Sequence, residues 1–272
     1  MDPFHLHLIS DSTGETICTA ARASLVQFDD IETEEHLWPM VRSREQVQRV
    51  IEAIKENPGF VLYTLVNQEV RAALEEECRR LNVPCIGLLD PVVTALAKYF
   101  DMEIKARPGR QHTLDAEYFE RIDAMHFALA HDDGQSTWDL TQADIILLGV
   151  SRTSKTPTCI YLANRGLKAA NIPLVPGCPI PEALYEADHA LIVGLTKDPK
   201  RLVEIRRQRL KLLDQDENTD YVDLDMVSKE INDARRLFTK HDWPVINVSR
   251  KSIEETASAI MQLYNEKRET LS

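Results

Sequence analysis

The segment from Asp144 to Pro157 constrains the fold of this chain more than any other part of the sequence. It reads DIILLGVSRTSKTP, so an apolar run from Ile145 to Leu148 breaks at Gly149 and gives way to small hydroxyl residues. A short run of branched residues predicts a strand buried on both faces. After Pro157, apolar residues recur with helical spacing, at Cys159, Ile160, Leu162, Ala163, Leu167 and Ala170. A strand, a hydroxyl-rich loop ending in Lys-Thr, and a helix form the context that a phosphate-binding loop requires.

The eight residues of this loop are assigned to the phosphates of a nucleotide: Gly149, Val150, Ser151, Arg152, Thr153, Ser154, Lys155 and Thr156. Backbone amides and the start of the next helix would point at the anion. Lys155 would reach the terminal phosphates, and the Thr156 hydroxyl would bind Mg²⁺. Ser154 replaces the second glycine of the wider consensus, which brings into question a positive φ at that position. The alternative is a polar turn in which Ser and Thr cap the helix.

A second hydroxyl-rich segment, SDSTGET, follows the first predicted strand, residues 4–10. Ser12 and Glu15 have the spacing of a capping box, so one interpretation is a well-capped helix. The other is a second anion site, in which Gly14 lets a ligand approach the backbone and Asp11 serves as a base or a metal ligand. This second phosphate site would use Ser12, Thr13, Gly14 and Thr16.

Predicted strands and helices alternate along most of the chain, which favours parallel sheets covered by helices. Further strands are expected at 35–41, 60–66, 85–89, 145–148, 172–175, 190–195 and 245–248. Residues 103–114 interrupt the alternation with four basic residues and a Pro-Gly pair, as a linker would. We therefore predict an α/β protein of two lobes with mainly parallel sheets. Its parts are an N-terminal α/β domain (1–102), a linker with a connecting helix (103–140) and a C-terminal P-loop kinase-like domain (141–272).

Charge and cysteine usage narrow the choice of partners and compartment. The net charge of -12 argues against nucleic acid or an anionic membrane as a partner. No run is long enough for a membrane span, and the N-terminus lacks the apolar stretch of a signal peptide. Five scattered cysteines indicate reduced thiols, so we expect a cytoplasmic protein without a zinc site. His5 and His7 share one face of the first strand, but with no further ligands nearby they are expected not to bind metal.

A basic segment from Lys197 to Lys211 follows the strand predicted at 190–195. It is interpreted either as a solvated helix face or as a contact to phosphate or a partner. The second interpretation rests on the rule that ligands bind at the carboxyl ends of strands in open α/β sheets. No acidic residue clearly ends a strand in the manner of a Mg²⁺ ligand. Asp198, three residues past a strand, is the candidate to join Thr156 at the metal.

Two long stretches, HLHLISDSTGET and GVSRTSKTPTCIYLANRGLKAANIPLVPG, resemble the pyruvate, phosphate dikinase regulatory protein family. The resemblance runs from Phe4 to the final helix, and the family's loop maps onto 149–156 without a gap. It implies a bifunctional serine/threonine kinase and phosphorylase. The kinase uses ADP to phosphorylate a threonine beside the catalytic histidine of its target. The phosphorylase removes that group with inorganic phosphate and releases pyrophosphate.

The resemblance also implies roles for residues and partners. Lys155 and the loop amides would hold the β-phosphate of ADP or the attacking phosphate, and Arg152 would steady the transferring group. Apart from the resemblance, the glycine in the first turn of the N-terminal motif favours a functional role for residues 11–16. Asp11 would then accept the proton of the target's threonine, and the two hydroxyl-rich motifs would face each other across a cleft. The expected catalytic residues are thus Lys155, Asp11 and Arg152, with Mg²⁺ as the expected ion. The target is pyruvate, phosphate dikinase or phosphoenolpyruvate synthase, and a homo-oligomer stays open.

Two other classes of function stay open on the sequence alone. The chain would also suit a non-catalytic nucleotide-sensing protein whose ADP-bound state docks on a partner. A small-molecule kinase that uses ATP is the third class. Because loop amides do not by themselves reject a third phosphate, selection of ADP over ATP is assigned to the basic segment 197–211.

Overall fold

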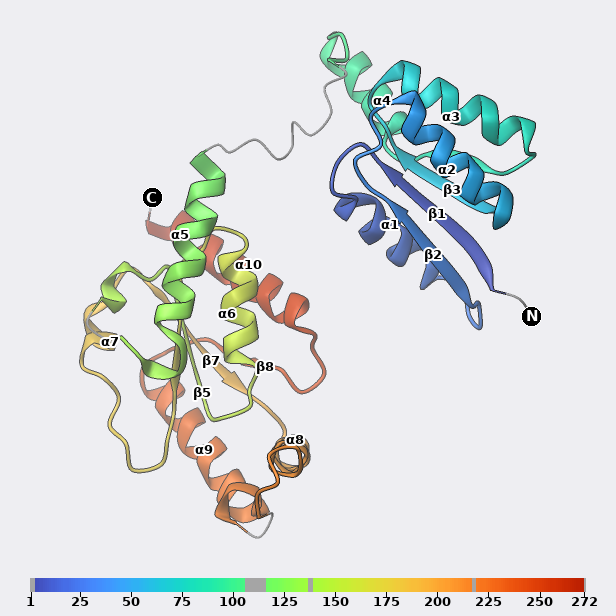
Figure 1. The fold of residues 1–272 in the computed structure, drawn as a ribbon. Helices are drawn as coiled ribbons and strands as arrows, with labels where there is room; N and C mark the ends of the chain where they lie inside the picture. The colour runs from blue at the N-terminus through green and yellow to red at the C-terminus, as the bar shows by residue number, and fades with distance from the viewer. Residues whose placement is uncertain (1–2, 106–115, 137–138, 217–218, 272) are drawn as a thin grey trace. The chain divides into compact units, whose positions relative to one another are not determined.

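The chain forms two compact units, Met1–Thr113 and Leu114–Ser272, each built on a four-stranded parallel sheet (Figure 1). The structure, a computed structural model, describes residues 3–105, 116–136, 139–216 and 219–271. The predicted α/β class with mainly parallel sheets is therefore confirmed. Most of the linker predicted at 103–114 lies outside the described residues.

The N-terminal unit has the strand order β2-β1-β3-β4. Leu6 and Leu8 of β1 pack against α1, while Ile9 on the opposite face packs with helices α2 and α3. Helix α2 begins with a capping box between Ser43 and Gln46. The elements are β1 (Phe4–Ser10), α1 (Glu15–Leu25), β2 (Thr33–Trp38), α2 (Arg44–Glu56), β3 (Gly59–Thr64), α3 (Gln68–Arg80), β4 (Cys85–Gly87) and α4 (Asp90–Phe100).

The C-terminal unit has the strand order β6-β5-β7-β8. Its helices are α5 (Ala116–Ala130), α6 (Lys155–Ala163), α7 (Ala183–Glu186), α8 (Pro199–Leu212), α9 (Leu224–Lys240) and α10 (Ile253–Leu271). Its strands are β5 (Ile145–Gly149), β6 (Ala169–Pro173), β7 (Leu191–Thr196) and β8 (Val245–Asn247). Short 3-10 turns occupy Asp132–Gly134 (η2), Leu140–Gln142 (η3) and Asp220–Val222 (η4).

Strand β5 is buried along its whole length, as its apolar sequence predicts. Ile146 and Leu148 belong to the core shared with α8 and α9. Ile145 and Leu147 belong to the core shared with α6 and α10. The sheet therefore has helices on both faces, and β5 lies between β6 and β7 in its middle.

The two units share one strand order, in which the first strand lies between the second and the third. In each unit the chain leaves the carboxyl end of that strand through a short loop and enters a helix, α1 or α6. At this switch point the neighbouring connections run to opposite sides, which is where open α/β sheets bind ligands. The loops 10–14 and 149–154 thus occupy equivalent positions in their units.

Several element boundaries differ from the prediction. Helix α6 ends at Ala163, and Gly166 turns the chain with φ 81, so Leu167 is not helical and Ala170 lies in β6. Small apolar residues at three- and four-residue spacing mimicked a continuing helix. Strand β6 accordingly covers 169–173 rather than 172–175, and β2 covers 33–38 rather than 35–41.

Gly194 of β7 provides a test of the packing between this sheet and α9. A Cβ at this position would lie 2.4 Å from Cδ2 of Phe238. We expect Gly194→Ala to lower the free energy of unfolding by about 1–3 kcal/mol, because the ring must move. Urea unfolding measures the loss. Phe238→Leu should recover part of it in the double variant, whereas strictly additive losses would contradict a direct contact.

Candidate functional site

The loop between β5 and α6 has the backbone of an anion cradle. At Gly149 a Cβ would lie 2.7 Å from both the Leu195 carbonyl oxygen and Thr153 Oγ1, so only glycine permits this close approach. Arg152 and Ser154 both have left-handed backbones, with φ 72 and φ 65. Ser154 therefore adopts the positive φ that its side chain had brought into question. Strain of this kind is characteristic of ligand-binding loops.

Helix α6 begins at Lys155 without a side-chain cap among the described residues. The hydroxyl of Thr153 instead donates to the Val150 carbonyl (2.9 Å), and that of Thr158 donates to the Ser154 carbonyl (2.7 Å). The alternative of a simple turn capped by Ser154 is therefore wrong. The Lys155 and Thr156 N–H groups of the first turn are left for another acceptor, whereas Pro157 has no N–H. Free N–H groups at a helix start are the arrangement that binds phosphate.

The Lys155 ammonium lies folded against its own loop. The side chain is 5% exposed, and Nζ donates to the Val150 carbonyl (3.2 Å). Burial lowers the pKa of Lys155 to about 8, although Asp133 and Asp132 act in the opposite direction. Burial also raises the pKa of the neighbouring Cys159 thiol, which argues against a thiolate nucleophile here. Lys155 is thus a cation without full compensation, as an anion site requires.

An acidic pair that sequence reasoning missed lies beside Thr156. The Thr156 hydroxyl donates to Asp132 Oδ1 (2.7 Å), and the Asn171 amide donates to the same oxygen (2.6 Å). Asp133 Oδ1 lies 3.4 Å from that amide nitrogen. The carboxylates come from η2 rather than from a strand end, so only the proximity of η2 to β6 reveals them. The adjacent acidic residues Asp132 and Asp133 were the one signal that the sequence offered.

His131 holds η2 in place. Its ring stacks on Phe127 with centroids 3.8 Å apart, and its two ring nitrogens face the Phe127 carbonyl (2.8 Å) and Asp139 Oδ1 (2.5 Å). The backbone carbonyl of His131 also accepts a hydrogen bond from the backbone N–H of Asn171 (3.0 Å). These contacts fix the two aspartates that follow it in the sequence.

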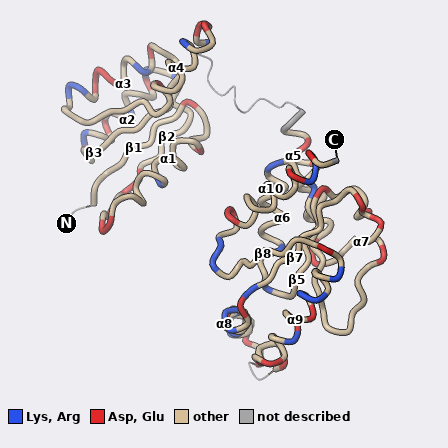
Figure 2. Tube along the Cα trace, turned by 180° about the vertical axis from the view of Figure 1, so that it is seen from behind, with Lys and Arg blue, Asp and Glu red and all other residues tan. Residues whose placement is uncertain are grey.

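The basic segment divides into distinct roles. Arg206 is buried, pairs with Glu230 (2.8 Å) and donates to the Ser151 carbonyl (3.3 Å), so it braces the loop from beneath. Lys197 is buried too, and burial lowers its pKa. It lies two residues beyond Leu195, the β7 residue against Gly149. Other cations of α8 are exposed and cluster along the helix (Figure 2): Lys200, Arg201, Arg207 and Arg209.

Asp198, the second candidate for the metal, caps α8. Its carboxylate accepts from the Arg201 amide (3.1 Å), and its own amide donates to Ser249 Oγ (2.7 Å). A metal role for Asp198 stays a prediction. Asp132, by contrast, already contacts the Thr156 hydroxyl.

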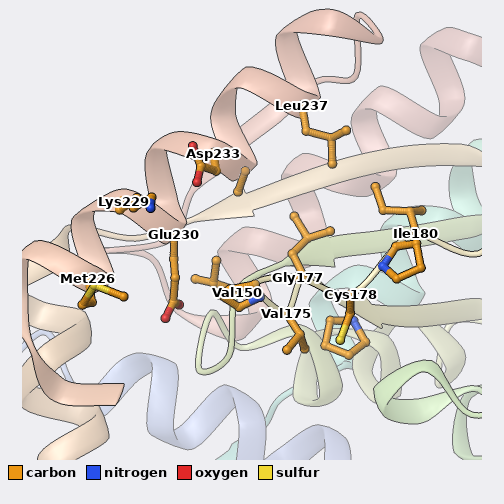
Figure 3. Close-up of a pocket in the computed structure, with 15 residues that line it drawn as sticks. Val150, Val175, Gly177, Cys178, Ile180, Met226, Lys229, Glu230, Asp233 and Leu237 are labelled. Carbon is orange, nitrogen blue, oxygen red and sulfur yellow. The ribbon is translucent and has the colours of Figure 1, made fainter. Parts of the chain in front are cut away.

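A cavity of about 340 Å³ borders the loop at Val150 (Figure 3). The segment after β6 forms one wall with Val175 and Ile180, and α9 forms another. Its lining is mostly apolar, with Glu230 and Asp233 as acceptors from α9. An apolar cavity with a few polar groups is the usual form of a site for a flat organic ring.

The N-terminal motif is held by its backbone and not by a capping box. Helix α1 starts after Gly14 (φ 88), with no side-chain cap among the described residues, so the capping-box interpretation is wrong. Asp11 is buried; its Oδ2 accepts from the Val66 amide (2.8 Å), and its carbonyl accepts from Arg42 Nε (2.7 Å). Burial raises the pKa of Asp11. The positive φ at position 14 accounts for a glycine there without the need for a bound ligand.

Comparison with known proteins identifies the family. Residues 6–261 match the sequence model of the kinase/pyrophosphorylase family. The chain belongs to this family. The resemblance inferred from the two motifs is thereby confirmed, and the kinase/pyrophosphorylase family is one of phosphotransferases.

Relatives in the kinase/pyrophosphorylase family align over nearly the whole chain. A protein of Paramagnetospirillum magneticum is 56% identical, with 97% of this chain and 85% of that protein aligned. A protein of Caulobacter vibrioides is 55% identical, with 96% of this chain and 83% of that protein aligned. A protein of Erythrobacter litoralis is 53% identical, with 98% of this chain and 96% of that protein aligned. All three carry the name of a pyruvate, phosphate dikinase regulatory protein. Among the residues that the structure describes, no helix has the length and apolar character to cross a membrane.

The low pKa of Lys155 predicts a pH dependence of nucleotide affinity. A phosphate is held by the charged lysine, and above a pKa of about 8 the neutral form dominates in the free protein. The dissociation constant for ADP should therefore rise with pH above 8, by up to about tenfold per unit. Calorimetry between about pH 7 and 9.5 measures it, in a range where a phosphate group is already ionised. Lys155→Met should bind weakly throughout; an inflection retained in that variant would contradict the assignment.

Proposed function

We propose that this kinase/pyrophosphorylase is a cytoplasmic, bifunctional regulator of pyruvate, phosphate dikinase. It phosphorylates a threonine of the target with ADP and removes the group with inorganic phosphate. The observation that carries the proposal is that Lys155 and Thr156 follow a loop with left-handed residues and no side-chain cap, and that Asp132 of η2 contacts Thr156. The names of the relatives supply the target. Phosphoenolpyruvate synthase is the second candidate, with the same chemistry.

ADP binding would use the loop for its phosphates and the neighbouring cavity for its nucleoside. The first-turn amides of α6 and the Lys155 ammonium supply the donors for the β-phosphate. From there the nucleoside extends past Val150 into the apolar cavity, where Glu230 accepts from the base or ribose. Arg206 ties Glu230 to the Ser151 carbonyl, so the cavity and the loop share one brace.

The residues around Thr156 fit Mg²⁺ by their chemistry. Hydroxyl and carboxylate oxygens are the hard ligands that this ion prefers, and Asp132 and Asp133 add negative charge. The Thr156 hydroxyl donates a hydrogen bond to Asp132 and accepts one from the Asn171 side-chain amide (3.0 Å), so one lone pair of its oxygen is left for the ion. When bound, the ion would neutralise charge on the phosphates during transfer. Asn171 Oδ1, buried and without a partner among the described residues, is a further acceptor there.

The transfer needs no nucleophile from this chain. In the forward direction the target's threonine oxygen attacks the β-phosphorus of ADP, the bond to the bridging oxygen breaks, and AMP leaves. Asp11, whose pKa is raised by burial, accepts the threonine proton. In the reverse direction an oxygen of inorganic phosphate attacks the phosphorus of the phosphothreonine, and the bond to the threonine oxygen breaks. Pyrophosphate forms, and the threonine oxygen takes up the proton of the attacking phosphate. Lys155 and Arg152 would balance the charge in both directions.

Incubation with ADP and each purified target tests the proposal. We expect phosphothreonine on the dikinase, located by mass spectrometry, with AMP formed in equal amount. Lys155→Ala should abolish transfer in both directions. Asp132→Asn keeps an oxygen for Thr156 but loses the charge, so it should slow transfer by about 10²-fold or more and shift the Mg²⁺ requirement upward.

Three outcomes distinguish the rival functions. ADP binding without transfer to either target would indicate a nucleotide sensor. Phosphorylation of a metabolite by ATP, with no protein partner present, would indicate a small-molecule kinase. Equal transfer from ADP and ATP to the same target would contradict the assignment of donor selection to residues 197–211, where Lys197 and Arg206 are buried cations.

Asp11 gives the sharpest test of the N-terminal motif. Asp11→Asn keeps an acceptor for the Val66 amide, so the fold should hold. Loss of the base should slow the kinase reaction by about 10²-fold or more, with little change in ADP affinity. Steady-state kinetics and calorimetry separate the two effects. Full activity in both directions would leave the 10–16 motif a purely structural element.

A further inference from the structure

Three potential metal ligands meet on one face of the N-terminal sheet, at the start of β1 and β2. In the parallel register His5 lies opposite Glu34, and His7 lies opposite His36. Residues two apart in a strand point to the same face, so all four side chains project from one side of the sheet. The sequence pattern pointed only to His5 and His7, because Glu34 and His36 follow about thirty residues later.

The distances among three of these side chains suit a single ion. His5 Nδ1 lies 3.0 Å from His36 Nε2 and 3.6 Å from Glu34 Oε2, and the three ligand atoms lie within 4.8 Å of one another. Zinc binds nitrogen and carboxylate oxygen at about 2.0–2.2 Å. Adjacent ligand atoms of such an ion are therefore roughly 3.0–3.5 Å apart. Small rotations of the exposed Glu34 side chain would complete the set.

His7 does not join the ligands but orients them. Its Nε2–H donates to the Asn57 carbonyl (2.8 Å), and its Nδ1 accepts from the Trp38 indole N–H (3.3 Å). With both nitrogens used, His7 is a neutral ring. It stacks on His36 with centroids 4.7 Å apart and an interplanar angle of 19°, which holds His36 toward His5. Such support from behind a ligand is typical of built metal sites.

We propose that His5, Glu34 and His36 bind a divalent transition-metal ion of the zinc class. Two imidazoles and one carboxylate suit zinc, cobalt or nickel and do not suit Mg²⁺, which prefers oxygen ligands. The His5 and Glu34 side chains are 21% and 56% exposed, so the ion has a path from solvent and keeps a position for water. This site belongs to β1 and β2 and does not depend on the proposed kinase chemistry.

The ion would tie the edge strand β2 to β1. Beyond the other end of β2, Met40 and Val41 donate backbone hydrogen bonds to Ser12 and Ser10, and Arg42 donates to Asp11. A fixed β2 therefore fixes the segment that shapes the 10–14 loop. A metal ion bound at the start of β1 and β2 would therefore make the 10–14 loop at the other end of these strands more rigid.

The experiment is a Co²⁺ titration of the full-length, tag-free protein after chelation, followed by visible absorption. We expect one Co²⁺ per chain with d–d bands of a histidine-carboxylate site, displaced by Zn²⁺, and a rise in melting temperature with either ion. Glu34→Gln should weaken binding at least about tenfold. Glu35→Gln is the matched control, because this neighbouring glutamate is also exposed but points to the other face of the sheet. This variant should bind Co²⁺ as the wild type does.

His36→Gln tests the imidazole, with His126→Gln, an exposed histidine of the other unit, as its control. Co²⁺ binding should be lost in His36→Gln and retained in His126→Gln. Absence of Co²⁺ binding to the wild type would overturn the proposal. Binding that survives in both Glu34→Gln and His36→Gln would overturn it as well, because the ion would then sit elsewhere, for example at the free cysteines. Glu34→Gln alters an exposed side chain, so it reports even if His36→Gln fails to fold.

Discussion

The close contact between Gly149 and β7 is the constraint on which the C-terminal site depends. With no side chain at 149, β5 ends against the Leu195 carbonyl and the chain must turn within a few residues. The turn places Arg152 and Ser154 in left-handed conformations and starts α6 without a cap. Arg206 pairs with Glu230 and donates to the Ser151 carbonyl. These contacts hold the loop in its strained conformation. The loop is thus shaped before any ligand arrives.

Apolar patterning made most of the fold predictable. Strand β5 and the capped helix α2 follow directly from their sequences, because burial on both faces and a Ser-x-x-Gln start have few other solutions. The pattern failed where small residues have no strong period, as between Ala163 and Ala170. The spacing of Ser12 and Glu15 also allowed a capping box as one interpretation, but the left-handed Gly14 decides the geometry instead.

The candidate site was predictable only where it is local in sequence. Lys155 and Thr156 follow from the loop, whereas Asp132 and Asn171 reach Thr156 from a turn and a strand that no spacing rule connects. Arg206 belongs to the basic segment for which the sequence allowed either a solvated helix face or a contact to phosphate or a partner. Its burial emerges only from the packing of α8 on α9. Long-range contacts of this kind depend on topology, which places η2 beside β6 and so beside the loop.

The edge strand β2 also bears on solubility. It is an outer strand of its sheet, and an open edge exposes backbone groups that can pair with another chain. Glu34 and Glu35 put a carboxylate on each face of this edge, and neighbouring copies would bring like charges together. Without them the run from Thr33 to Trp38 would carry no formal charge and would present a β-prone segment at the rim. The two carboxylates of Glu34 and Glu35 therefore oppose edge-to-edge pairing between the β2 strands of two molecules.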